Sequence, residues 1–170
     1  FITGFPVDMA FKRDVNKVTN YGLSSRLIQE GTLIPNDNSA MDRPHPYYMF
    51  DYSNGWRAPL TEASADLSWM WRRAPGFFDV VTYEGNSVAG REVPHNLAAA
   101  PEMMWVKSLD RTDGWQVYVA PLTESYRLFL DRDIDKRSSS GCWSSAPTAT
   151  KLIFDADANV NGTGDFVAYL

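Results

Sequence analysis

Cysteine is almost absent from this chain of 170 residues, because Cys142 is its single copy. One cysteine excludes a disulfide within the chain and a zinc site built on several cysteines. No apolar run approaches the roughly 18 residues that a helix needs to cross a bilayer, and the first residues show no signal peptide. We therefore expect no membrane insertion and a fold that depends on packing alone.

Positive charge is also scarce, since 16 Lys and Arg stand against 21 Asp and Glu, which gives a formal net charge of −5. The basic residues form no block or stripe, so we expect no nucleic-acid partner. Apolar residues make up 44% and aromatic residues 14% of the chain, which is typical of a globular protein and argues against disorder.

What the sequence does contain is an internal repeat. Residues 8–13 (DMAFKR) resemble residues 102–107 (EMMWVK), 94 positions later. Further matches keep the same order, namely Asn20-Tyr21 with Gly114-Trp115, residues 33–36 with 128–131, and residues 67–70 with 167–170. The offset grows only in one direction, to 100, as loop insertions would cause. A unit of about 95 residues suits a small domain with its own core, so the sequence predicts two tandem copies of one fold.

Short runs rich in aromatic and β-branched residues, bounded by Gly, Asp, Asn, Ser or Pro, predict β-strands in both copies. In the second copy they lie at residues 77–83, 103–107, 115–119, 126–130, 151–154 and 165–170. Residues 20–30 align with the run at Trp115, so we expect strand or loop there. Asp113-Gly114 and Asn161-Gly162 are typical of tight turns. The spacing of about ten residues favours a sandwich or barrel over βαβ units.

The predicted fold class is all-β, with two tandem antiparallel β-sandwich domains of jelly-roll or lectin-like type. The join lies at residues 72–76, where Pro75-Gly76 favours a turn. We place the first domain at residues 1–73 and the second at 77–170. The first is incomplete, because it has no counterpart to the strand predicted at 77–83. Two long loops at equivalent places, residues 34–46 and 131–147, are the expected recognition segments.

Several motifs resemble a tandem domain of unknown function found in virion proteins of tailed phages. The junction at residues 69–83 (WMWRRAPGFFDVVTY) carries much of the resemblance. The other matching segments are residues 90–97, 100–103, 115–118, 146–148, 160–162 and the closing 166–170. The resemblance implies a part in building the virion or in contacting the host, often in tail fibres or tail tips. The family has no established active site to carry over.

Enzymatic chemistry finds little support in the residue pattern. Acids such as Asp110, Asp113, Glu124 and Asp131 could form a glycosidase pair beside a tryptophan, but their spacing specifies no pair. The two histidines, His45 and His95, are interpreted as loop residues bonded to backbone. Cys142 is interpreted as a small buried residue rather than a nucleophile. We therefore predict no enzyme and no cofactor.

A calcium loop is an alternative for the segment that carries Asp155, Asp157 and Asn159, which places oxygen ligands at alternate positions. An EF-hand needs Gly at its sixth position, where this segment has Val160. We favour a turn whose Asp and Asn side chains bond nearby backbone.

Six tryptophans are the remaining signal. The alternation of Trp69 with Trp71, and of Met103 with Trp105, predicts core faces of strands. Trp143 lies in a serine-rich loop instead, so a glycan site formed by Trp143 with Tyr118 and Arg127 is our site hypothesis. The alternative is that Trp143 anchors its loop to the sandwich.

Together these patterns predict a non-enzymatic structural protein on the phage particle surface or tail, in a tail fibre or other appendage. Its expected partners are further copies of itself, with a trimer by analogy with tail fibres, other virion proteins and host-surface polysaccharide. The alternatives are a carbohydrate-binding module of a secreted cellular protein and a capsid decoration protein.

Overall fold

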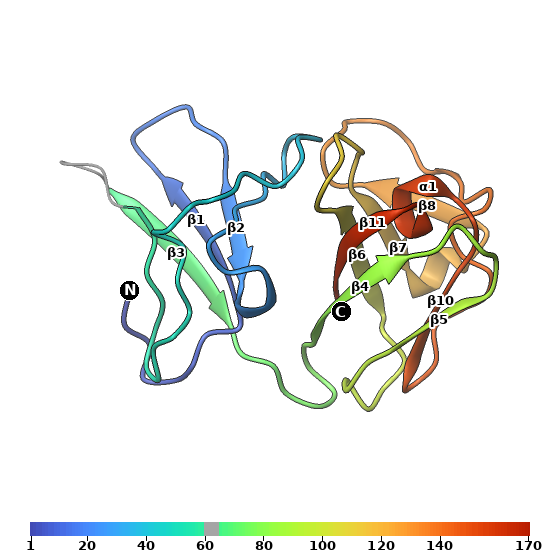
Figure 1. The fold of residues 1–170 in the computed structure, drawn as a ribbon, viewed down its shortest axis with the longest axis horizontal. Helices are drawn as coiled ribbons and strands as arrows, with labels where there is room; N and C mark the ends of the chain where they lie inside the picture. Colours follow the sequence, from blue (N-terminus) through green and yellow to red (C-terminus); the bar gives the residue numbers. More distant parts are fainter. Residues whose placement is uncertain (60–64) are drawn as a thin grey trace.

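The computed structural model describes residues 1–59 and 65–170, and its regular elements are almost entirely β-strands. Figure 1 shows the first half of the chain beside the second, with the strands of each half forming their own sheets. The first-half elements are β1 (Met9–Asp14), β2 (Gly22–Ser25), the 3-10 turn η1 (Arg26–Ile28) and β3 (Asp66–Trp71). Those of the second half are β4 (Val80–Gly85), β5 (Arg91–Pro94), β6 (Met103–Ser108), β7 (Gln116–Val119), η2 (Ala120–Leu122), β8 (Tyr126–Phe129), β9 (Arg137–Ser138), β10 (Lys151–Phe154), α1 (Ala158–Asn161) and β11 (Gly164–Tyr169). No helix in these described ranges has the length and hydropathy to span a membrane.

The first half contains one antiparallel sheet with the strand order β2-β1-β3. One of its faces packs against the irregular segment 47–58, and the two share a small core. The buried members of that core are Val7, Ala10, Tyr48, Phe50, Trp56 and Ala58. Phe50 and Trp56 stack with their ring centroids 5.4 Å apart, so aromatic side chains cover this face of the sheet where a sandwich would have a second sheet.

The second half is a sandwich of two antiparallel sheets. The larger has the order β4-β11-β6-β7-β8-β9, and the smaller pairs β10 with β5. Their facing side chains form the second core, which includes Tyr83, Met104, Val106, Leu152 and Phe154. The all-β prediction is therefore confirmed, and the sandwich is consistent with it. The finer jelly-roll or lectin-like type stays a prediction, as do the domain boundaries.

The sequence repeat reappears as identical strand pairing. In the first half, Phe11 pairs with Leu23 of β2 and with Trp69 of β3. In the second half, Trp105 pairs with Val117 of β7 and with Tyr169 of β11. These are the positions that offsets of 94 and 100 predict, and the turns η1 and η2 also lie 94 residues apart. Each copy is therefore a three-stranded unit with the same register around its central strand.

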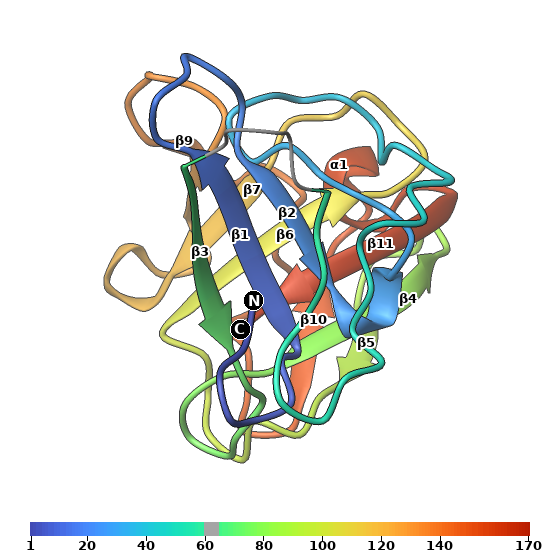
Figure 2. The same cartoon turned by 90° about the vertical axis from the view of Figure 1, so that its left-hand side faces the viewer.

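One difference between the copies lies beside the third strand. In the second copy, β11 pairs with β6 on one side and with β4 on the other. In the first copy, β3 pairs with β1 and has no second partner strand within the described residues. Figure 2 shows β3 as the outermost strand of its sheet. Among the described residues, the first copy therefore has no strand in the place that β4 takes in the second copy.

A third apolar cluster joins the two copies. Its first-copy members are Met9, Leu23, Ile28 and Leu33, and its second-copy members are Phe78, Val80, Leu109, Trp115, Val167 and Tyr169. Hydrogen bonds also cross the same interface. The backbone N–H of Met41 donates to the Leu109 carbonyl at 2.8 Å, and the Trp115 Nε1 donates to the Ile34 carbonyl at 3.1 Å. The copies are thus packed face to face.

Two sequence predictions about turns are wrong. Asp113-Gly114 lies in a seven-residue connection between β6 and β7, and Gly114 does not adopt a positive φ. Asn161 ends the short helix α1, and Gly162, its C-cap, has a φ of −65°. The first connection is a longer hairpin loop between paired strands, and the second joins strands of different sheets. The Pro75-Gly76 turn at the join is confirmed, with Gly76 at a φ of 71°.

The interface between the copies predicts the effect of a core truncation. Leu33 is fully buried in the shared cluster, so Leu33→Ala leaves a cavity there. We expect the free energy of unfolding to fall by about 2–5 kcal/mol, measured by urea denaturation. Leu27→Ala is the matched control, because Leu27 is 41% exposed and its loss costs about 0.5 kcal/mol or less. Equal effects of the two substitutions would contradict the assigned interface.

Candidate functional site

The three residues of the predicted glycan site lie close together but are packed into the second-copy core. The rings of Tyr118 and Trp143 meet edge to face, with centroids 6.0 Å apart, and expose only 3% and 5% of their surface. The Trp143 Nε1 donates to the Tyr126 carbonyl at 3.2 Å. No ring face is left for a sugar to stack on, so this burial argues against the glycan role and favours the loop-anchor alternative.

Arg127 serves the same structural purpose. Its Nη1 lies 3.2 Å from the Gln116 Oε1, 2.8 Å from the Cys142 Sγ and 3.3 Å from the Asp157 Oδ2. One guanidinium therefore connects β8, the strand beside it, the serine-rich loop and the start of α1. The sequence hypothesis grouped three residues that do lie close together, but it did not predict that their side chains point into the core.

The acidic segment considered for calcium is held by protein donors. Asp157 is the N-cap of α1, and its Oδ1 accepts from the backbone N–H of Asn159 at 2.8 Å and from the Asn159 side chain at 2.6 Å. The Asp155 Oδ1 accepts from the N–H of Ala156 at 2.8 Å. Within residues 1–59 and 65–170, no group of three or more His, Cys, Asp and Glu could hold a metal ion. The geometry favours the side-chain-to-backbone turn over a calcium loop.

The two histidines and the cysteine have protein partners in the fold. His95 is buried, its Nδ1 accepts from the N–H of Leu97 at 3.2 Å, and its Nε2 lies 3.1 Å from the Thr148 carbonyl. The loop interpretation of His95 is thus confirmed. His45 has a side-chain partner that the sequence did not predict, since its Nε2 lies 3.4 Å from the Asp42 Oδ2. Burial raises the pKa of Cys142 to about 12, so the thiol stays protonated at neutral pH.

Three of the acids weighed for hydrolysis, Asp110, Asp113 and Asp131, also support the fold. The Asp131 Oδ1 accepts from the N–H of Trp115 at 2.9 Å, and the Asp110 Oδ2 accepts from the N–H of Asp165 at 2.7 Å. The Asp113 Oδ2 pairs with the Arg111 Nε at 2.6 Å. These carboxylates hold the ends of strands and loops in place.

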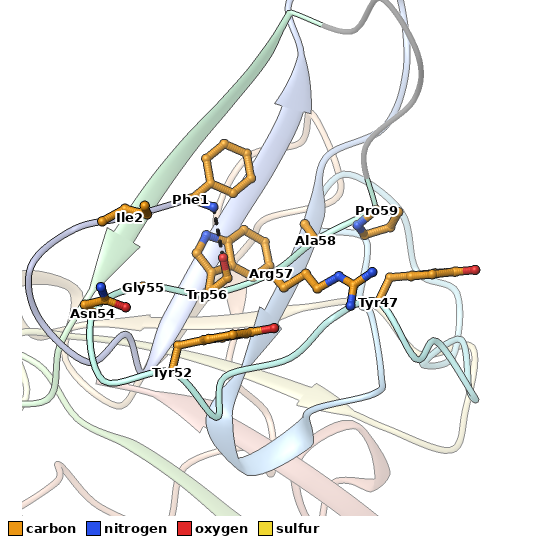
Figure 3. Close-up of a pocket in the computed structure, with 10 residues that line it drawn as sticks. All are labelled: Phe1, Ile2, Tyr47, Tyr52, Asn54, Gly55, Trp56, Arg57, Ala58 and Pro59. Atoms are coloured by element: carbon orange, nitrogen blue, oxygen red, sulfur yellow. Dashed lines mark hydrogen bonds between the residues drawn. The ribbon is translucent and has the colours of Figure 1, made fainter.

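A pocket of about 740 Å³ opens on the first copy, on the outer side of the segment that covers its sheet. Figure 3 shows its lining side chains, among them Tyr47, Tyr52 and Arg57. The two tyrosines are 50% and 42% exposed, and the Arg57 guanidinium lies 5.7 Å from the Tyr47 ring centroid. Trp56, only 2% exposed, forms a rigid base under Phe1. Exposed rings beside donors of this kind can bind the apolar face and the hydroxyls of a sugar.

A second exposed feature is the aromatic surface along β3. Trp69 is 42% exposed, although its alternation with Trp71 predicted a core face. Phe11, Trp69 and Trp71 line a groove of about 420 Å³, and Trp71 also lines a neighbouring pocket of about 270 Å³ with Trp105. The prediction fails at Trp69 because its strand lies at a sheet edge. Tyr169, which occupies the same position on β11, is 3% exposed.

The interface between the copies buries one cation. Lys107 is fully buried, and its Nζ donates to the carbonyls of Ser108 at 2.7 Å and Arg111 at 2.9 Å. Burial lowers the pKa of Lys107 from 10.5 to about 8, and Asp113 is the leading opposing charge. Lys107 was not predicted as a site residue, although it stands in an apolar strand pattern and at the repeat position of Arg13.

The fold and these sites define an all-β protein with two fused copies of one strand unit. A family described as a domain of unknown function, DUF7483, matches residues 61–170. The chain therefore belongs to the DUF7483 family. No curated protein and no solved structure matches the chain. The resemblance to a domain of unknown function is thus confirmed, whereas the link to phage virions stays a proposal.

The buried lysine predicts how stability depends on pH. Between about pH 8 and pH 9 the unfolded chain holds a proton on Lys107 that the folded chain has already lost, so the free energy of unfolding should rise with pH. From about pH 9 Cys142 offsets this rise, because its thiol ionises near pH 9.0 in the unfolded chain and stays protonated in the folded chain. Above pH 10 the rise should reverse, because burial raises the pKa of Tyr83 and Tyr169 and the unfolded chain ionises first. Urea denaturation of wild type across this range measures both trends.

Lys107→Met is the variant that isolates this effect. It should remove the rise between pH 8 and pH 9, whereas the control Lys136→Met, at an exposed position, should retain it. A rise of unchanged slope in folded Lys107→Met would show that another group titrates.

Proposed function

We propose that the chain is a non-enzymatic structural module of a phage virion, located in a tail fibre or another appendage. The observation that carries the proposal is the combination of two fused strand units with a β3 edge that is open among residues 1–59 and 65–170. A firm interface between the copies suits a building part, and an open edge suits addition of a neighbour. The resemblance at residues 69–83 supplies the phage context.

The use of polar side chains supports a role without catalysis. The side chains of His95, Cys142, Asp110 and Asp131 are bonded to backbone or to neighbouring side chains. A catalytic acid, base or nucleophile needs a substrate within reach of its reacting atom. The exposed features are instead aromatic surfaces, the pocket around Tyr47 and Tyr52 and the groove at Trp69, which suit binding.

The partners we propose are further copies of this chain and other virion proteins. A capsid decoration protein and a carbohydrate-binding module of a secreted cellular protein are the alternative roles. Each alternative places the chain somewhere else: on the capsid, or in a secreted cellular product.

Labelling of particles tests the proposed location. Gold-tagged antibodies raised against the chain should decorate a tail or fibre on purified particles from a culture that carries the gene, as seen by electron microscopy. Label on the capsid would support the decoration role instead. Particles without label, from lysates in which the chain is detected, would overturn the virion assignment.

Glycan recognition is a second proposed function, favoured by the pocket around Tyr47, Tyr52 and Arg57. Stacking of an exposed tyrosine on a sugar ring contributes on the order of 1 kcal/mol. Tyr52→Ala should therefore weaken binding of host-surface polysaccharide by about fivefold in calorimetric titration.

Two variants serve as controls for that titration. Tyr126→Ala removes a ring that is 39% exposed outside the pocket, and Trp143→Phe changes the buried ring of the earlier hypothesis. Both should bind polysaccharide as the wild type does. If Trp143→Phe loses binding and Tyr52→Ala does not, the glycan site lies at the serine-rich loop and not in the tyrosine pocket.

A further inference from the structure

The backbone of β3 presents regularly spaced hydrogen-bonding groups at its open edge. The N–H of Val15 donates to the Ala65 carbonyl at 3.1 Å, and the register pairs Arg13 with Leu67 and Phe11 with Trp69. Odd-numbered residues of β3 therefore bond to β1, and the backbone groups of even-numbered residues point away from it. Among the described residues, the backbone groups of Ser68 and Met70 have no hydrogen-bond partner.

The second copy shows that this edge has the geometry to accept a strand. In β11 the even-numbered residues pair with β4, and that ladder ends in two bonds between Leu170 and Asp79, at 2.9 and 3.2 Å. The repeat offset of 100 maps Ala168 and Leu170 onto Ser68 and Met70. The same backbone groups are thus used by an antiparallel strand in one copy and left open in the other.

We propose that two copies of the chain pair antiparallel through their β3 edges, about a two-fold axis at Trp69. The inference rests on the proposed assembly role and specifies which surface of the chain contacts a second copy. In this register Ser68 bonds with the partner's Met70, and Met70 with the partner's Ser68. The three-stranded sheets of two chains become one continuous six-stranded sheet.

The side chains along β3 favour a second copy as the occupant. Trp69 and Leu67 are 42% and 45% exposed on one face, and the pairing sets Trp69 beside the partner's Trp69, which covers both rings. An edge that pairs with its own copy closes as a dimer, because the bonding groups of both edges are then used.

Analytical ultracentrifugation tests the pairing. An interface of this small size gives weak association, so sedimentation should be followed up to about 1 mM chain. We expect the 19.2 kDa chain to form a dimer. Trp69→Lys, which sets two cations face to face, should weaken the dimer at least about tenfold. Leu27→Lys is the matched control, because Leu27 is 41% exposed away from β3. Leu67→Lys provides a second disrupting variant if Trp69→Lys does not fold by circular dichroism.

Disulfide trapping tests the register. Facing residues of a pair without hydrogen bonds have Cα atoms about 4.5 Å apart, which suits a disulfide. Trp69→Cys should therefore form a covalent dimer under mild oxidation. Leu67→Cys, on the same face and equally exposed, should not, because the two sites are about 13 Å apart in this register. The single native cysteine is buried and does not interfere.

The outcomes separate this inference from the proposed function. A monomer at all concentrations, or a Trp69→Cys chain that does not cross-link, would overturn the β3 pairing. Particle labelling would then still decide the virion role independently. A dimer in solution together with unlabelled particles would support the pairing and overturn the virion role.

Discussion

The antiparallel ladders around the central strands β1 and β6 are the constraint on which the rest of the structure depends. A slip of one residue in either ladder would move every side chain to the opposite face of its sheet. In the register observed, Phe11 and Trp105 face the interface between the copies, and Ala10 and Val106 face the core of their own copy. The same pairing therefore specifies three apolar clusters at once.

Polar side chains connect these clusters. The Asp8 carboxylate lies 3.2 Å from the Arg26 Nε and accepts from the N–H of Arg73 at 2.8 Å, which ties β1 to η1 and to the linker. The Asp79 carboxylate accepts from the N–H of Asn96 at 2.7 Å in the second copy. Because buried charges require such partners, the residue types that suggest chemistry in the sequence are largely engaged in holding loops.

The fold class and the repeat could be predicted from sequence because strand periodicity depends on local composition. The offsets of 94 and 100 relate the ladder register of one copy to that of the other, but the register itself comes from the structure. The orientation of Trp69 and Trp143 could not be predicted, because each depends on which strands lie beside it. Trp69 stands at a sheet edge and is exposed, whereas Trp143 pairs with Phe154 and is buried. The tyrosine pocket was missed because segment 47–58 has no strand pattern.

The position of Cys142 has a consequence for a protein exposed to an oxidising medium. Its thiol is enclosed in the second-copy core, beside Arg127, with a raised pKa that keeps it protonated. Thiolate chemistry is therefore available only after the sandwich opens. The rate at which a thiol reagent modifies the native chain would therefore measure how often the second copy opens locally, independently of the first copy.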